Sequence, residues 1–324
     1  MQPLDFSDLQ RPGEYRIIVP GDPGVASPWF RIGPAWELVE PLIGDTVTFF
    51  QTQRDGPDVI PGDLGRKPSH LNDRAAAVYQ WPDYPDPDSE AIDGDLTPLV
   101  GRTDLAGGWF DAGNFIKFSH TTAYADALLW TTQRKLGAAA PETLIPEARS
   151  GLDWLAKAWH PDTCVLDLQV CIGAGDIQGT YVGDHDLWRL PETDDALTGG
   201  ANRYLSHRPA FAANAPGAPV PPNLAGRVAA AFALAAQVTA ATDPARATKL
   251  LDGLRAQLDG AVAQADTDPF GAGFATDEFD AVPHAFGLTA TARLYRLLTA
   301  TTPTTRSPRS SGTGSSGPTR GESR

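Results

Sequence analysis

The sequence predicts a mainly α-helical protein with a short β-segment near its start. In six segments the apolar residues recur every three to four positions, which is the spacing of amphipathic helices. These segments cover residues 35–54, 117–136, 146–159, 223–241, 244–264 and, more weakly, 287–299. Residues 55–106 and 160–222 lie between them, are rich in Gly, Pro and Asp, and are expected to be mostly irregular. Helices separated by long loops indicate a helical scaffold that carries its chemistry on the loops.

The β-segment lies within residues 13–32. Tyr15, Ile17 and Val19 alternate with residues of the opposite face, which predicts a strand, and a second short run covers residues 29–32. Two strands by themselves cannot form a sheet with a core. The segment is therefore expected to be the end of a β-domain.

Several helix ends have local signals. Pro34 suits the first turn of the helix that follows it, and Gly137 suits the end of the second helix. Asp243 can cap the helix that begins with Pro244.

The composition limits the classes of partner. The chain has 324 residues and a formal net charge of −14, and an acidic surface repels the phosphates of nucleic acid. No apolar run approaches the roughly 20 residues of a membrane span. The N-terminus lacks the basic and apolar regions of a signal peptide, so the location of the protein stays open. Residues 301–324 form a low-complexity tail that is expected to be disordered.

Tryptophan and cysteine leave alternatives open. The 8 Trp residues suit either core packing or the flat aromatic surfaces that stack on sugar rings. Cys164 and Cys171 fit no zinc or redox spacing, and they are either two buried free thiols or a local disulfide.

The most informative segment spans Gly107–Phe118 and reads G-G-W-F-D-A-G-N-F-I-K-F. It resembles the G-G-W-[YF]-D-A-G-D-x-x-K-[FY] signature of glycoside hydrolase family 9. Phe49–Gly56 resembles the end of the first barrel helix of that family, and Ser69–Asp73 resembles the H-x-x-D that follows. Gly151–Leu155 is similar to a third-helix motif, and Gly13–Ile32 to the last strands of an immunoglobulin-like domain.

The resemblance implies an inverting cellulase with an (α/α)6 barrel, here incomplete and truncated at both ends. The expected domains are a remnant of the immunoglobulin-like β-domain at residues 1–33, a partial barrel at 34–300 and the tail at 301–324. The implied substrate is a β-1,4-glucan or cello-oligosaccharide. No cofactor is expected, although family members often carry structural calcium, whose ligands the sequence does not identify. Intact members are usually secreted.

The resemblance also implies roles for two residues. An inverting enzyme needs a carboxylate base and a carboxylic acid about 6.5–9.5 Å apart, with the attacking water at the base. In the family, both acids of D-A-G-D hold that water and the second is the base. Here these positions are Asp111 and Asn114, and an amide cannot accept a proton at ordinary pH. Asp111 is expected either to serve as a weaker base or to cap the turn or the next helix.

The second candidate loop, Tyr181–Glu192, resembles the family's D-H-x-x-W-x-x-P-E loop. The resemblance implies that His185 contacts the sugar, and Trp188 could stack on a ring. Trp109, beside Asp111, is expected either to line the cleft or to lock the turn. A metal site at this loop is not expected, because adjacent side chains point apart.

The match fades after residues 281–286, and no counterpart of the family's general-acid segment follows. We therefore expect impaired hydrolysis, with a non-catalytic glucan-binding remnant or a non-functional gene fragment as alternatives. An unclosed barrel would also leave Phe232, Leu250 and Leu254 short of partners, and marginal stability is the expected consequence.

Overall fold

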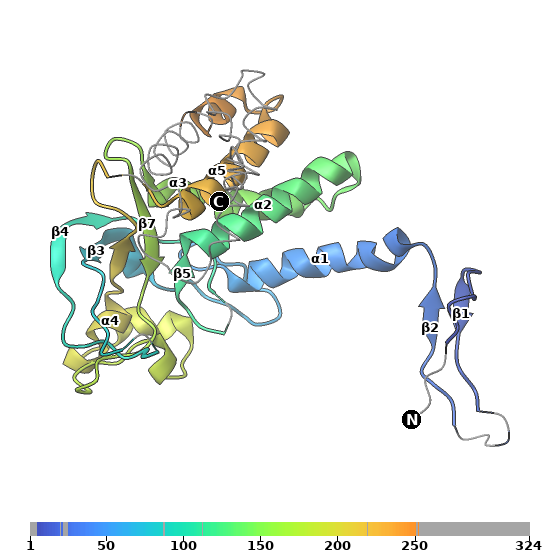
Figure 1. Cartoon of the computed structure of the whole chain (residues 1–324), viewed down its shortest axis with the longest axis horizontal. Helices are drawn as coiled ribbons and strands as arrows, with labels where there is room; N and C mark the ends of the chain where they lie inside the picture. Colours follow the sequence, from blue (N-terminus) through green and yellow to red (C-terminus); the bar gives the residue numbers. More distant parts are fainter. Residues whose placement is uncertain are drawn as a thin grey trace, which may run out of the picture.

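The computed structural model describes residues 5–250 and 252, except residues 20, 22–24, 87, 112 and 219. A helical body and a small sheet make up most of this part, and a β-hairpin lies apart from them beyond the far end of helix α1 (Figure 1). The predicted helix at 287–299 and the predicted tail at 301–324 lie outside the described residues.

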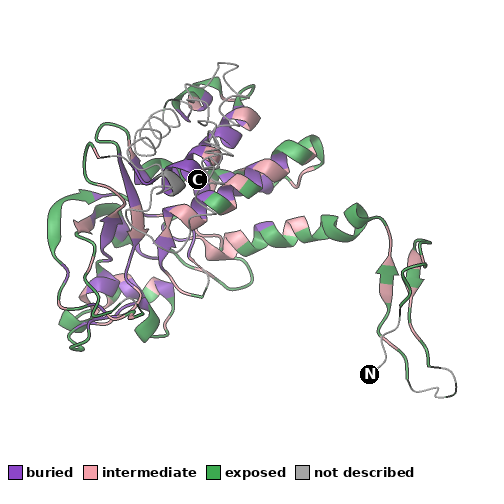
Figure 2. Cartoon of the chain, viewed as in Figure 1, coloured by how far each residue is buried: buried purple, intermediate pink, exposed green. Residues whose placement is uncertain are grey.

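The hairpin consists of β1 (Gly13–Tyr15) and β2 (Phe30–Ile32), paired antiparallel with Gly13 opposite Ile32. Both strands are shorter than the alternation predicts. The large apolar side chains Ile18 and Trp29 are exposed, and none of the hairpin's described residues is fully buried (Figure 2). Two isolated strands are expected to form a hydrogen-bonded ladder without a buried face, and the hairpin agrees with this expectation.

Four long helices agree with the apolar spacing. They are α1 (Ala35–Gln53), α2 (Ser119–Leu136), α3 (Leu144–Ala158) and α5 (Pro222–Thr239). Residues 244–250 are also helical, as predicted for the start of the next helix. Gly137 ends α2 with a φ of 55°, and its N–H donates to the carbonyl oxygen of Gln133. Shorter helical turns complete the description: η1 (Leu71–Ala75), η2 (Gly137–Ala139), η3 (Asp184–Asp186), η4 (Pro191–Ala196), η5 (Gly200–Asn202) and α4 (Arg203–Ser206).

The main core lies between α2, α3 and α5. Trp130 of α2, Leu152 and Leu155 of α3, and Val228 of α5 are all fully enclosed. Helix α5 is rich in Ala, and such small side chains allow neighbouring helices to approach closely. None of the described helices is long and apolar enough to cross a bilayer.

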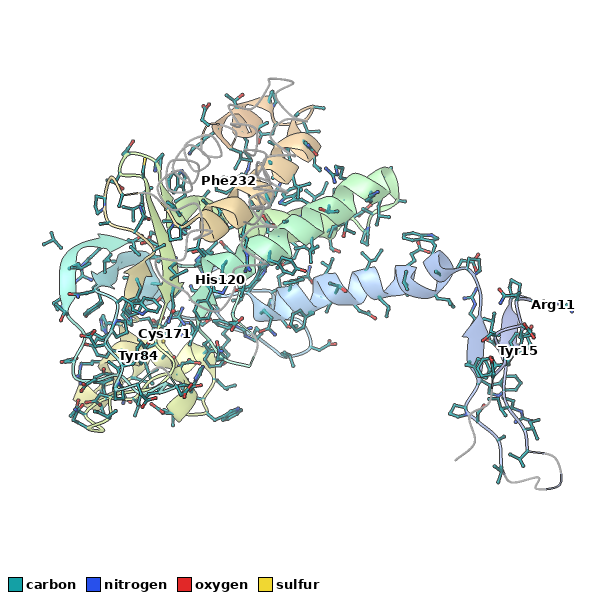
Figure 3. The ribbon with its side chains drawn as sticks, viewed as in Figure 1. Arg11, Tyr15, Tyr84, His120, Cys171 and Phe232 are labelled. Carbon is teal, nitrogen blue, oxygen red and sulfur yellow. The ribbon has the colours of Figure 1, made fainter. Side chains whose placement is uncertain are left out.

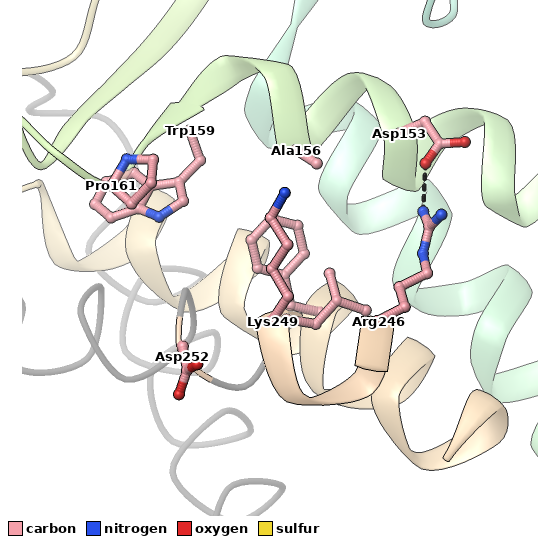
Figure 4. A pocket seen from close by; sticks show the side chains of 9 residues that line it. Asp153, Ala156, Trp159, Pro161, Arg246, Lys249 and Asp252 are labelled. Carbon is pink, nitrogen blue, oxygen red and sulfur yellow. Dashed lines mark hydrogen bonds and ion pairs between the residues drawn. The ribbon is translucent and has the colours of Figure 1, made fainter. Parts of the chain in front are cut away.

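The expectation that Phe232 and Leu250 lack partners is wrong. Phe232 is 2% exposed and Leu250 is 6% exposed, and both belong to the main hydrophobic core. They border a hollow of about 420 Å³, near which Arg246 forms an ion pair with Asp153 (Figure 4). Leu254 lies outside the described residues.

The two segments expected to be mostly irregular contribute most of the strands of a six-stranded sheet, whose order is β4-β3-β8-β7-β5 with β6 paired to β7. Its strands are β3 (Ala76–Tyr79), β4 (Pro98–Thr103), β5 (Lys117–Phe118), β6 (Trp159–His160), β7 (Val165–Val170) and β8 (Ala210–Ala212). Strands of two to six residues are too short to show clear alternation, and most of their partners are distant in sequence. The helix predicted from residue 117 begins two residues later, because Lys117 and Phe118 form β5.

Both cysteines are free thiols, so the disulfide alternative is excluded for this structure. Cys164 is exposed, whereas Cys171 is buried after β7, where it is seen in the body of the protein (Figure 3). Burial raises the pKa of Cys171 to about 12, so this thiol stays protonated and unreactive.

Candidate active site

The segment that carries the acidic signature forms a tight loop between β4 and β5. The N–H of Phe110 donates to the carbonyl oxygen of Gln53 at 2.9 Å, which attaches the loop to the end of α1. The N–H of Asp111 donates to the carbonyl oxygen of Ile116 at 2.8 Å and closes the loop. Gly108, three residues before Asp111, has a φ of 81°, and a Cβ at this position would lie 2.7 Å from the ring of Trp154. The loop thus requires the glycine found in its sequence.

Asp111 and Asn114 lie on this loop in different environments. Asn114 is partly buried, and its side-chain oxygen accepts the N–H of Ile116 at 2.9 Å, as in an Asx-turn. Asp111 is partly exposed, and among the described residues no hydrogen bond or ion pair engages its carboxylate. The capping interaction in this turn therefore comes from Asn114, and the Asp111 carboxylate is available to water.

Two side chains from distant segments fix the peptide next to Asn114. Asp184 accepts the N–H of Phe115 at 2.9 Å, and Arg208 donates to the carbonyl oxygen of Phe115 at 2.6 Å. Both backbone polar groups of Phe115 are thereby held by side chains from other parts of the chain. Asp184 belongs to the second candidate loop, so this contact brings the two predicted loops together.

A buried ionic cluster lies behind the loop. Lys117 donates to Asp55 at 2.8 Å and lies 2.9 Å from Asp73, while Arg208 binds Asp73 at 2.6 Å and Asp55 at 3.2 Å. None of these four residues is more than 2% exposed. Burial opposes ionisation of Asp55, but the charges of His70, Lys117 and Arg208 outweigh it and hold the pKa of Asp55 well below its usual value.

His70 extends this cluster to the second loop. Its ring nitrogens lie 2.9 Å from the Asp55 carboxylate and 3.1 Å from the Asp194 carboxylate. Burial and the nearby Arg208 lower the pKa of His70, yet the charge of Asp55 and the bonds to both carboxylates raise it overall. Arg189 then joins Asp194 to Asp184, at 2.6 Å and 2.7 Å. One continuous network therefore connects the two loops.

The network unites the segments that resemble one family, although they are far apart in sequence. Asp55, Asp73 and Lys117 stand inside quoted motifs, so their presence could be noted but their contacts could not. Arg208 and Asp194 were missed, because each stands outside the residues matched to a motif. A buried arginine has no local sequence signal, and only its partners identify it.

His185 and Trp188 lie on the surface of the second loop. The exposed fraction of Trp188 is 88%, and the His185 side chain is 38% exposed with Nδ1 at 3.1 Å from the carboxylate of Glu90. A Cβ at Gly173 would lie 3.2 Å from the His185 ring, so the ring rests directly on this glycine backbone. Both side chains are accessible to a ligand.

Comparison with known proteins identifies the family. The family model of Glycosyl hydrolase family 9 matches residues 40–265, which is more than half of the chain. The chain belongs to glycoside hydrolase family 9. Endoglucanase 2 of Oryza sativa subsp. japonica is 33% identical over 214 residues, which cover 64% of this chain and 27% of that protein. Endoglucanase 14 of Arabidopsis thaliana is 35% identical over 158 residues, covering 46% and 27%.

Solved family 9 structures share the fold. A metagenome-derived family 9 endoglucanase superimposes with a TM-score of 0.55 at 22% identity, covering 92% of this chain and 49% of that one. The endoglucanase of the termite Nasutitermes takasagoensis gives a TM-score of 0.53 at 25% identity, covering 83% and 52%. Family 9 structures have an (α/α)6 barrel fold, the helical part of this chain is similar to part of it, and the chain spans about half the length of these structures.

The position of Trp109 corrects one of the site expectations. Its side chain is 4% exposed, and its indole N–H donates to the carboxylate of Glu147 at 2.8 Å. The ring lies against Gly151 of α3, where an added Cβ would be 2.2 Å from it. This burial does not agree with a substrate-binding role. Of the two roles expected for Trp109, the burial of its side chain agrees with locking the turn.

The residues of the second loop do not fit a metal site. Asp184 is held by Arg189 and Phe115, and Asp186 accepts the N–H groups of Gly175 and Gly183. Within the described part of the chain, no group of three or more His, Cys, Asp or Glu residues could hold a metal ion.

Proposed function

We propose that this chain is a cellulase-type glycoside hydrolase directed at β-1,4-glucan, and that its hydrolytic turnover is impaired. The observation that carries the proposal is the loop that offers a free carboxylate at Asp111 and an amide at Asn114. The family membership, the names of the related endoglucanases and the solved complex of the cellulase Cel9M of C. cellulolyticum with cellobiose support the substrate class.

The chemistry explains why turnover is expected to be low. Inversion requires one carboxylate to remove a proton from water while an acid on the opposite side protonates the leaving oxygen. Asn114 can orient the water but cannot accept its proton, and Asp111 is left as a weaker base. Within these 324 residues no segment resembles the one that supplies the general acid in the family.

A non-catalytic glucan-binding role is the second candidate. It is favoured by the exposed ring of Trp188 beside His185, which can stack on and hydrogen-bond a sugar without any proton transfer. A carboxylate is not needed for such binding. The two candidates share one substrate and differ only in turnover.

We further infer that the hairpin of β1 and β2 is the remnant of an immunoglobulin-like β-domain at residues 1–33, followed by a partial barrel at 34–300. The antiparallel pairing and the lack of a covered face support this division. It predicts that a variant beginning at residue 34 keeps the circular dichroism and the urea unfolding midpoint of the full chain. A large loss of either would contradict it.

Calorimetry and product analysis with cellotetraose test the proposal. The full chain should bind the sugar, Trp188→Ala should bind it roughly tenfold more weakly, and turnover should be about 1000-fold or more below that of complete family 9 enzymes. No detectable binding of cellotetraose would support a non-functional gene fragment instead.

Asn114→Asp tests the role of the missing base separately. The variant should not restore turnover, because base and acid act together and no segment of these 324 residues resembles the acid segment of the family. Asp111→Asn is the matched control and should abolish any residual hydrolysis. Turnover by the unmodified chain at the rate of complete enzymes, with inversion, would overturn the impairment.

A further inference from the structure

A second hollow lies at the junction of β3, β4 and α4, on the side of the molecule where these three labels are grouped (Figure 1). Its volume is about 440 Å³, which is within the usual range for small-ligand sites. It is lined by Tyr79, Asp95, Leu96, Pro98, Arg203, Tyr204 and His207. None of these residues belongs to the loops that carry Asp111 and Trp188.

Asp95 is held in one orientation by bonds to a single oxygen. Its Oδ1 accepts the N–H of Leu96 at 2.9 Å and the hydroxyl of Tyr204 at 2.6 Å, and it lies 3.1 Å from the Arg203 guanidinium. No described residue bonds to Oδ2. The carboxylate therefore presents a fixed acceptor whose remaining oxygen is open to a ligand.

Arg203 is also fixed. Its guanidinium lies 4.5 Å from the ring centroid of Tyr181 and 4.9 Å from that of Tyr204, and it donates to the carbonyl oxygen of Gly200 at 2.7 Å. These contacts hold the positive charge against Asp95. The pair is locally neutral, so the hollow has no strong preference for an anion or a cation.

Aromatic side chains and unused polar atoms complete the hollow. Tyr79 packs edge-on against Tyr204 with ring centroids 5.7 Å apart, and Tyr204 is only 5% exposed. Among the described residues nothing bonds to the Tyr79 hydroxyl or to Nε2 of the exposed His207, whose Nδ1 lies 3.2 Å from Ser206 Oγ. An apolar floor with a few fixed polar groups at its edge suits a sugar ring better than a purely apolar ligand.

We propose that this hollow is a second saccharide-binding site that accommodates a neutral pyranose unit of an oligosaccharide. The choice of a glucan rests on the proposed function. Asp95 Oδ2 would accept a sugar hydroxyl, the Tyr79 hydroxyl and His207 Nε2 would bond to others, and the tyrosine rings would contact the sugar C–H groups.

Calorimetric titration of the full chain with cellotetraose tests the site in a Trp188→Ala background, in which the first site is weakened. Trp188→Ala should still bind one equivalent. Adding Tyr79→Phe and His207→Ala should weaken that binding by about tenfold or more, because two hydrogen bonds are lost. Both substitutions remove polar atoms at the edge of the hollow and keep the bonds of Asp95, and the melting temperature verifies folding.

Each outcome decides between the two sites. Residual binding that is lost with Tyr79→Phe and His207→Ala supports the second site. Absence of any binding by Trp188→Ala, or binding that is unchanged by the two further substitutions, overturns it. If Trp188→Ala binds as tightly as the unmodified chain, the first site is contradicted, and the effect of Tyr79→Phe and His207→Ala on binding still decides the second site.

Discussion

Single charged residues determine how the candidate site is held. Lys117 and Arg208 are cations without water contact, and the carboxylates of Asp55 and Asp73 compensate both. Isolating one of these charges in the interior is costly, because the remaining partners lose their compensation. The loop therefore depends on buried residues that lie behind it.

Arg208→Met should destabilise the protein strongly. The side chain is buried, and its removal deprives Asp55 and Asp73 of one of their cations and frees the carbonyl of Phe115, so we expect a loss of about 3–5 kcal/mol in the free energy of unfolding. Urea unfolding measures it. Arg102→Met is the control, since Arg102 is exposed and donates only to a backbone carbonyl, and a loss below about 1 kcal/mol is expected. Equal losses in the two variants would contradict a special role for the buried cluster.

His70 should make stability depend on pH in a defined direction. Its pKa in the folded protein is raised above the ordinary 6.5, so the folded state keeps its proton where the unfolded chain has lost it. The contribution is complete below pH 6.5 and disappears as pH rises through the folded pKa. His70→Gln should flatten this decline in urea unfolding measured across the range.

His160 is expected to contribute to the same loss of stability with rising pH, so its effect has to be measured separately from that of His70. The bond to Asp167 raises the pKa of His160, against a smaller effect of burial. The His160→Gln variant measures its share of the decline. If the slope between pH 6.5 and 9 were the same with and without His70, the charged form of this residue would not stabilise the fold.

Among the elements, α3 and the acidic loop depend on each other. Gly151 of α3 leaves the space that the Trp109 ring occupies, and Gly108 leaves the space for the ring of Trp154, which also belongs to α3. The orientation of the loop against α3 is therefore set by two rings that pack on two glycines. Neither contact involves Asp111 or Asn114.

Gly151→Ala should destabilise the protein even though alanine favours helices. The new Cβ would overlap the Trp109 ring, and overpacking of this kind costs about 1–3 kcal/mol in the free energy of unfolding. Gly44→Ala in α1 is the matched control. No atom lies within 4 Å of its added Cβ, so this variant should gain up to about 1 kcal/mol from helix propensity. Two variants that change stability in the same direction would contradict the packing argument.

At the scale of the whole molecule, α1 stands out because it exposes apolar side chains on one side. Val39, Leu42 and Phe49 are each between 48% and 55% exposed, and their spacing places them on one stripe of the helix. Figure 2 shows that burial increases toward the end of α1 that meets the body. An exposed stripe of this kind favours association of the protein with itself or with other apolar surfaces.

Substitution on this stripe should reduce self-association. Val39→Glu with Leu42→Lys adds no net charge and removes two exposed apolar side chains, so light scattering at increasing concentration should show a smaller mean mass than for the unmodified chain. Exposed Glu40 provides a control, because Glu40→Gln changes the same helix without touching the stripe. If the mass of all three proteins rose equally with concentration, association would not depend on α1.

Part of this protein could be predicted from its sequence because the responsible interactions are local. Helix spacing depends on residues three or four positions apart, and α1, α2, α3 and α5 lie where that spacing predicts them. Motif matches depend on contiguous residues, and they identified the family and the segments that meet at the candidate site. The prediction that Asn114 stands at the position of the family's base concerns a single residue type and needs no structure.

Other features were decided only by the tertiary structure, because they depend on residues that are close in space and distant in sequence. Arg208 and Asp55 are 153 positions apart, and no local pattern indicates their contact. The short strands of the sheet gain their hydrogen bonds only after the chain has folded back on itself. Trp109 is buried because α3 packs against its ring, whereas Trp188 is exposed because the described part of the protein leaves its ring uncovered. A residue's type limits the chemistry it can perform, but its surroundings decide whether water, a sugar or another side chain reaches it.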